Sequence, residues 1–209
     1  MTRDTKQIIL DEALNLFSQN GYDGVSVADI AKAVGIKASS LYKHYKSKQD
    51  IFDSILAKSV EKYAETTSQL NIDGNAPEHD IEMYSKISTD SLVQIGVGLF
   101  LFFLHDEYAR KIRQMLTIEQ YKNPMASNLY VAQYLDGPLL YQSTIFKAFM
   151  AQGIMKNLHA HAAAMHFYSP IFAMLCLCDN RPDREAESLE FVKQHIIQFE
   201  KLYMHREDI

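Results

Sequence analysis

The sequence predicts an all-α protein, with a small N-terminal helical domain followed by a larger helical domain. Apolar residues recur three or four positions apart along most of the chain, and no stretch alternates apolar and polar residues as a strand does. Of the 209 residues, 47% are hydrophobic and 22% are charged, which is enough apolar material for a buried core. Only five prolines and eight glycines interrupt the helical pattern. We predict domains over residues 1–46 and 47–209.

The first two helices have clear start and stop signals. Asp4 is a good N-cap for a helix that Asn20-Gly21 should end. Ser26 is a second good N-cap, and Asp29 three residues later lies at the positive end of the helix dipole. Gly35 should end this second, short helix, and a tight turn follows it.

Further helices are expected along the rest of the chain. A third helix is predicted over 38–44, and a fourth from Ser47 to about Ser68. Residues 71–79 are expected to form a loop, and later breaks in the helical pattern are predicted at 105–106, 123–124, 136–138 and 179–183. The last two long helices are predicted over 158–178 and 184–203.

The second helix, the turn and the third helix have the pattern of a helix-turn-helix. Ala31 is small where two helices must cross closely, Gly35 relieves the backbone of the turn, and Ile36 and Leu41 fill the space beneath. The outward side chains of the third helix are then polar or amphipathic, and can meet phosphates and base edges in the major groove. These are Lys37, Ser39, Ser40, Tyr42, Lys43 and His44.

Charge is distributed unevenly over a chain whose net charge is −5. The window 32–48 contains five lysines and no acidic residue. A lysine at position 48 opposes the dipole at the start of the fourth helix, a cost that a nearby phosphate would offset. Ser26 can cap its helix and also bind a phosphate. The predicted DNA-binding residues are Ser26, Lys37, Ser39, Ser40, Tyr42, Lys43, His44 and Lys48; the alternative for the lysines is a solvated face.

The stretch from Ala13 to Phe52 resembles the TetR family of bacterial transcription regulators. The resemblance rests on the phenylalanine before Gly21-Tyr22, on Ser26 with Asp29-Ile30-Ala31, on Leu41-Tyr42, and on Tyr45-x-Ser47-Lys48. Two positions depart from the family pattern, because Lys37 stands where a capping serine is common and Ser39 where a glycine is common. The resemblance implies a dimeric repressor bound to a palindromic or pseudo-palindromic operator in double-stranded DNA. A small ligand in the larger domain would tilt the fourth helix and release the repressor from this site.

Dimerisation is predicted for the last two long helices. Leu189, Val192, Ile196 and Phe199 form a stripe with alternating spacings of three and four residues, as in a coiled coil, and the helix before it is rich in alanine. The resemblance implies a four-helix homodimer interface built from these two helices of each subunit. The predicted interface residues are Ala163, Phe172, Leu189, Val192, Ile196 and Phe199, and the alternative is that they pack inside one chain.

The middle of the chain is rich in tyrosine, methionine and phenylalanine. Such residues can line an apolar ligand pocket with a few polar groups, although core packing is the simpler interpretation. The candidate pocket residues are Phe103, Tyr108, Met115, Tyr134, Tyr141 and Met165. A DNA-binding regulator without a small ligand, controlled by a protein partner or constitutive, is the alternative.

Other functional classes have little support. His159 and His161 point to different faces of a helix, and Cys176 and Cys178 are splayed in the same way, so we predict no metal site and no cofactor. Enzyme motifs such as a nucleophile elbow or a phosphate loop are absent, and a helical-bundle enzyme is a remote alternative. The apolar run 95–104 is about half the ~20 residues of a membrane span. We therefore expect a cytoplasmic regulator that is not an enzyme and does not bind a membrane.

Overall fold

The computed structural model describes residues 4–69, 77–85 and 88–205. These residues are helical apart from turns, loops and one isolated antiparallel bridge between Met155 and Met204, which confirms the all-α prediction. The contacts divide the chain into two compact units. Unit 1 comprises Met1–Glu65 and Glu107–Tyr130, and unit 2 comprises Thr66–Asp106 and Val131–Ile209. This grouping differs from the division predicted after residue 46, because a helix near the middle of the chain packs against the first helix.

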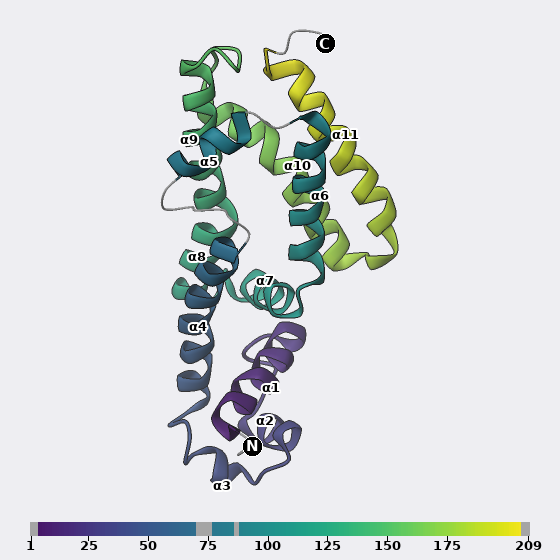
Figure 1. The fold of residues 1–209 in the computed structure, drawn as a ribbon. Helices are drawn as coiled ribbons and strands as arrows, with labels where there is room; N and C mark the ends of the chain where they lie inside the picture. Colours follow the sequence, from purple (N-terminus) through teal and green to yellow (C-terminus); the bar gives the residue numbers. More distant parts are fainter. Residues whose placement is uncertain (1–3, 70–76, 86–87, 206–209) are drawn as a thin grey trace. The chain divides into compact units, whose positions relative to one another are not determined.

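Unit 1 contains the N-terminal helices and two helices from the middle of the chain (Figure 1). Its elements are α1 (Thr5–Asn20), α2 (Val27–Val34), α3 (Ala38–Leu41), α4 (Lys48–Gln69, in unit 1 up to Glu65), α7 (Glu107–Glu119) and α8 (Pro124–Val131, in unit 1 up to Tyr130). Helix α1 packs against α2 and α7, and α2 packs against α3. The buried side chains of Phe17, Ile30, Leu41 and Phe52 form part of the core, as the apolar spacing indicates.

The predicted starts and stops of the first helices are confirmed. The Asp4 carboxylate accepts from the backbone N–H groups of Lys6 and Gln7, and Gly21 ends α1 with a φ of 70°. At the start of α4, the Asp50 N–H donates to the Ser47 hydroxyl with a nitrogen–oxygen distance of 3.0 Å. These side chains satisfy donors that a helix end leaves without partners.

Unit 2 consists of helices that pack around α10 (Figure 1). Its elements are α5 (Pro77–Ser85), α6 (Thr89–His105), the π-helix η1 (Ala132–Asp136), α9 (Gly137–Ala151), α10 (Ala160–Asn180), the 3₁₀ turn η2 (Pro182–Arg184) and α11 (Glu185–Tyr203). Helix α10 contacts α9, α11 and α6, while α5 packs on α9. The loop predicted over 71–79 lies mostly outside the described residues, and the prediction is wrong for 77–79, which begin α5. Proline is favoured at the first helical position that Pro77 occupies.

The break predicted at 136–138 is not present. The π-helix joins α8 to α9 without interruption, and Gly137 has helical dihedrals of φ −60° and ψ −55°. The N–H of Gly137 donates to the carbonyl of Ala132, five residues earlier. This wider turn accommodates the ring of Pro138, which lacks the N–H of an ordinary helical residue.

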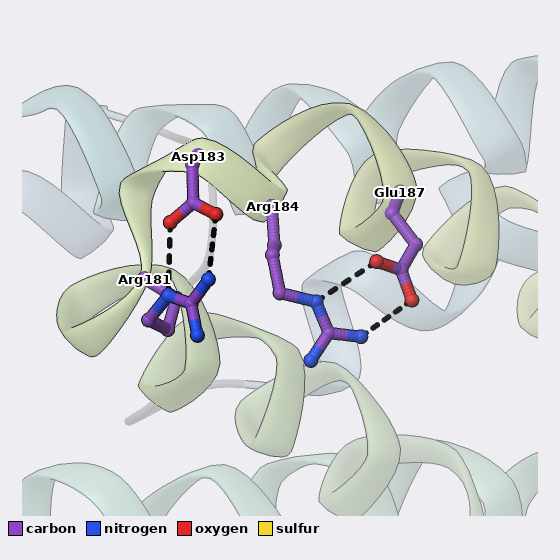
Figure 2. Close-up of polar contacts among 4 residues, drawn as sticks. All are labelled: Arg181, Asp183, Arg184 and Glu187. Atoms are coloured by element: carbon purple, nitrogen blue, oxygen red, sulfur yellow. Dashed lines mark hydrogen bonds and ion pairs between the residues drawn. The ribbon is translucent and has the colours of Figure 1, made fainter.

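Two arginine–carboxylate pairs hold the turn between α10 and α11 (Figure 2). Arg181 binds Asp183 through Nε and Nη2, with nitrogen–oxygen distances of 3.0 and 2.8 Å. Arg184 binds Glu187 through the same two nitrogens. The arginine hydrogen bonds lower the pKa of both carboxyl groups, which therefore stay charged well into the acid range. The pairs are exposed, so they define the geometry of the turn more than they stabilise the fold.

The stripe predicted to form the dimer interface packs inside unit 2 in the single chain. Val192 and Ile196 are 0% exposed, and Phe199 is 5% exposed. The reason is that α11 turns this face toward α6 and α10. A side-chain carbon added to Gly96 of α6 would lie 2.5 Å from Ile196 Cδ1, which shows how closely the two helices approach.

The other three predicted interface positions also face this interior. Ala163 is buried in the apolar cluster around Phe199. Phe172 and Leu189 are partly buried and pack against the neighbouring cluster that contains Val192 and Ile196. All six residues therefore take part in the packing of the single chain, which is the alternative that the sequence left open.

Candidate nucleic-acid interface

The second helix of the motif is held at both ends by local interactions. The Ser26 hydroxyl donates to Asp29 Oδ2 over 2.6 Å, and the Ser26 N–H donates to the same oxygen over 2.9 Å. The Asp29 N–H in turn donates to the Ser26 hydroxyl. These bonds from Ser26 lower the pKa of Asp29, so the cap is charged at neutral pH. At the other end Gly35 adopts the left-handed conformation, with φ 77° and ψ 32°, which reverses the chain toward α3.

The third helix is shorter than predicted. Regular helix covers Ala38–Leu41, whereas residues 42–44 continue as a turn rather than as α-helix to position 44. The Lys43 N–H bonds to the Ser40 carbonyl and the His44 N–H to the Leu41 carbonyl, a tighter spacing of three residues. Lys37 occupies the N-cap position and makes no capping bond with its side chain, as expected for a lysine.

Most side chains predicted to contact DNA are exposed around this short helix. Tyr42 is 53% exposed. Lys37, Ser39, Lys43 and His44 are exposed as well, and Ser40 is partly buried. The segment therefore presents hydroxyl, ammonium, phenol and imidazole groups to solvent in a span of eight residues, which suits both phosphate and base-edge contacts.

Two buried side chains anchor this exposed segment. Leu41 is 0% exposed and Tyr45 is 3% exposed. The Tyr45 hydroxyl donates to the carbonyl of Lys6 in α1, with an oxygen–oxygen distance of 3.3 Å. Burial raises the pKa of Tyr45 to about 12, and nearby carboxylates add to the shift. The anchors hold a helix that is too short to be stable alone.

The lysines of the basic window divide into two groups. Lys32, Lys37, Lys43 and Lys46 are exposed, as a phosphate-binding surface requires. Lys48 is partly buried, and its Nζ donates to the carbonyls of Tyr22 and Val25, both over 2.8 Å. These two bonds offset the unfavourable position of the Lys48 charge at the positive end of α4, so no phosphate is needed to explain it. A contact between Lys48 and DNA stays a prediction.

A contact with α7, which sequence reasoning missed, supports the turn between α1 and α2. The Tyr22 N–H donates to Glu119 Oε1 over 2.8 Å, and Glu119 is only 2% exposed. The two residues are 97 positions apart, and no local pattern in the sequence connects them. Glu119 falls at helical spacing on the same face of α7 as Ile112, Met115 and Leu116, and a carboxylate on this apolar face is the signal that could have drawn attention to it.

The candidate pocket residues are divided between the two units. Tyr108 and Met115 belong to unit 1, where Met115 is fully buried. The others belong to unit 2, and Met165 is 46% exposed there, which does not suit the lining of an enclosed pocket. Tyr141 donates its hydroxyl proton to buried Asp80, which lies on α5. Burial, followed by this bond, raises the pKa of Tyr141 far above its ordinary value, so its hydroxyl is neutral.

Comparisons with known proteins match this geometry. Residues 9–55 match the family described as bacterial regulatory proteins, tetR family. A relative is IcaR of Staphylococcus aureus (strain Newman), the HTH-type negative transcriptional regulator of the biofilm operon icaADBC. It is 34% identical over 126 residues, which cover 60% of this chain and 59% of the relative. The alignment thus spans less than two thirds of either protein.

Solved structures share the complete fold. SmeT of Stenotrophomonas maltophilia, in a complex with triclosan, has a TM-score of 0.66 and 15% identity, with 97% of this chain and 93% of that chain covered. FadR of Bacillus subtilis, in a complex with stearoyl-CoA, has a TM-score of 0.60 and 18% identity, with 92% and 96% covered. At these identities the likeness shows the fold alone. Residues 9–55 are thus similar to the tetR family of bacterial regulatory proteins, and the described chain has the fold of these solved regulators.

Proposed function

We propose that the chain is a sequence-specific DNA-binding repressor of transcription. The observation that carries the proposal is the exposed segment 37–44, held on the buried anchors Leu41 and Tyr45 within a TetR-family domain. The negative regulator IcaR, which aligns with 60% of the chain, supports repression over activation. We place the protein in the cytoplasm, where its DNA would be accessible, and we propose no catalytic activity.

A reporter assay tests the direction of regulation. Duplexes that the purified chain selects from a random pool are placed across the promoter of a reporter gene. Production of the chain should lower expression, and Tyr42→Ala, which shortens an exposed side chain of the proposed interface, should restore most of it. Increased reporter expression with the wild-type chain would contradict repression. Expression that the wild-type chain leaves unchanged would contradict regulation through this site.

We propose a homodimer formed by the outward faces of α10 and α11. Phe191 is 47% and Leu202 is 62% exposed, and their spacing of eleven residues places them on one face of α11. On α10, Met165 is 46% exposed. By length and composition α10 could cross a membrane, a test that core helices of water-soluble proteins also pass. A second copy would cover these apolar residues and supply the second recognition segment that a two-fold operator requires.

We propose further that a small ligand releases the protein from its operator. SmeT in complex with triclosan and FadR in complex with stearoyl-CoA support ligand control in relatives of this fold. Within unit 2, Phe103, Tyr134 and Tyr141 remain candidates for such a site. A compound that raises the Tm of the free protein and also lowers its affinity for the operator supports this proposal. A protein whose bound compounds all leave operator affinity unchanged favours the partner-controlled or constitutive alternative.

A further inference from the structure

Two charged side chains, one an acceptor and one a donor, bind the backbone of the turn between α1 and α2. Glu119, at the last residue of α7, accepts the Tyr22 N–H over 2.8 Å. Lys48, at the first residue of α4, donates to the carbonyls of Tyr22 and Val25, both over 2.8 Å. Each bond has one charged partner, which makes it stronger than a bond between neutral groups.

The fit around this turn is tight. Gly21 has a φ of 70°, and a side-chain carbon added there would lie 3.0 Å from Glu119 Oε1 and 3.1 Å from Ile118 Cγ2. The Tyr22 ring lies 5.0 Å from the Phe52 ring between centroids, and Lys48 Nζ lies 4.0 Å from the centroid of the Tyr22 ring. The turn therefore cannot shift without a response from α4 and α7.

The two helices that hold the turn are also those that continue the chain to and from unit 2. Helix α4 leads out of unit 1 at Glu65, and α7 begins directly after Asp106, where a segment of unit 2 ends. On the other side of the turn, Val25 is followed by Ser26, the N-cap of α2. A displacement of α4 or α7 would reach the first residue of the helix-turn-helix through Tyr22.

We propose that Glu119 and Lys48 are positioning residues that clamp the Tyr22 turn and couple the state of unit 2 to the orientation of the helix-turn-helix. Glu119 is a buried carboxylate at the negative end of a helix, so the loss of its N–H partner would be unfavourable. Movement of α7 must therefore carry the turn along or break this bond. The inference rests on the proposed control of DNA binding by unit 2, and it names the residues through which that control acts.

Hydrogen exchange tests the clamp without knowledge of the effector, because coupling between two sites is reciprocal. The probe is the duplex that the wild-type chain selects from a random pool. Its binding at unit 1 should slow amide exchange in α6 and α9 of unit 2 in the wild-type protein. Each variant is measured at a duplex concentration that saturates it, so that weaker DNA binding cannot account for a lost response. Glu119→Ala and Lys48→Met should then each remove this change, whereas Glu119→Gln, which keeps an oxygen acceptor, should retain it.

Lys122→Ala is the matched control. It breaks an exposed ion pair to Asp23 in the same turn, 3.3 Å between Nζ and Oδ2, and should leave the response intact. All variants are compared at a temperature at which circular dichroism shows them folded, and Lys48→Met carries the test should Glu119→Ala fail to fold. A full response in folded Glu119→Ala or Lys48→Met, or no response in the wild type, would overturn the clamp. Failure of the wild type to select any duplex would instead overturn the proposed function.

Discussion

At the scale of single residues, the site depends on a few buried side chains that hold exposed ones in place. A helix of four residues has little stability in water, so α3 needs tertiary contacts. Leu41 supplies apolar contact, and Tyr45 adds a hydrogen bond to α1. These neighbours and the backbone bonds of the turn fix the backbone of Tyr42 and Lys43, which reduces the backbone entropy lost when the two residues bind DNA.

Tyr45 should make the fold sensitive to alkaline pH. Its pKa is about 12 in the folded protein and near 10 in an unfolded chain, so its contribution to stability is complete below pH 10 and is lost as the pH rises toward 12. In this window the free energy of unfolding should fall by about 1.4 kcal/mol per pH unit from this group. Urea unfolding at pH 9 to 12 should show a shallower decline for Tyr45→Phe. Tyr121→Phe, at a position that is 88% exposed, is the control. Parallel curves for Tyr45→Phe and wild type would contradict the assignment.

Tyr42 and Lys43 should differ in the kind of DNA contact that they make. We expect Tyr42→Ala to lower operator affinity about tenfold, or about 1.4 kcal/mol, with a much smaller effect on unrelated duplexes. Lys43→Ala should weaken both kinds of DNA together and reduce the salt slope by about one unit. Fluorescence anisotropy at several salt concentrations distinguishes the two patterns. Full operator preference in Tyr42→Ala would transfer the base-reading role to Ser39, Ser40 or Lys37.

Local chemistry made the caps and the buried anchors predictable from the sequence. Ser26, Asp29 and Gly35 act on neighbours within a few positions, so their roles can be read from spacing. Lys48 and Glu119 bind backbone groups that are 23 to 97 residues away. No single-sequence pattern identifies such partners, because the tertiary fold brings them together.

At the scale of elements, the junction of α8 and α9 shows how a helix can continue through residues that usually end one. The dipeptide Gly137-Pro138 predicts a break in the helix. The helix instead continues through a π turn, in which the Gly137 N–H donates to the Ala132 carbonyl. A side-chain carbon on Gly137 would lie 2.5 Å from that carbonyl oxygen, which is a steric clash. The glycine is therefore needed for close approach within the helix, and this requirement cannot be distinguished from a stop signal in the sequence.

Two glycine substitutions should have opposite effects on stability. Gly137→Ala should lower the free energy of unfolding by about 1–3 kcal/mol, because the added methyl group strains the π turn. Gly98→Ala in α6 meets nothing within 4 Å and should raise it by about 0.5–1 kcal/mol through helix propensity. Chemical denaturation of both variants checks the pair. A neutral or stabilising Gly137→Ala would show that the junction readily adopts an ordinary α-helical turn.

At the scale of the whole molecule, the proposed homodimer depends on which face of α11 a second copy covers. The periodic stripe of α11 correctly indicated a packed face, but α6 and α10 of the same chain occupy it. The sequence pattern could not choose between packing inside one chain and packing between two, because both bury an apolar face. Exposure in the folded chain points instead to Phe191 and Leu202.

Charge substitutions on the two faces of α11 should separate assembly from folding. Phe191→Glu places a carboxylate on the exposed face and should give a folded monomer with weakened operator binding. Phe199→Glu places a charge in the core and should lower the free energy of unfolding by at least about 3 kcal/mol. Sedimentation and thermal unfolding measure the two outcomes. A Phe191→Glu variant that stays dimeric would exclude this face as the interface.

Selection of duplexes from a random pool by the full-length wild-type chain tests the central claim most directly. A dimer that presents two copies of segment 37–44 should enrich an inverted repeat with half-sites about one helical turn of DNA apart. Substitution of Tyr42 and Lys43 by alanine should abolish this enrichment while the protein remains folded. A wild-type pool with no enriched sequence, or enrichment that survives the double substitution, would contradict DNA recognition through this segment.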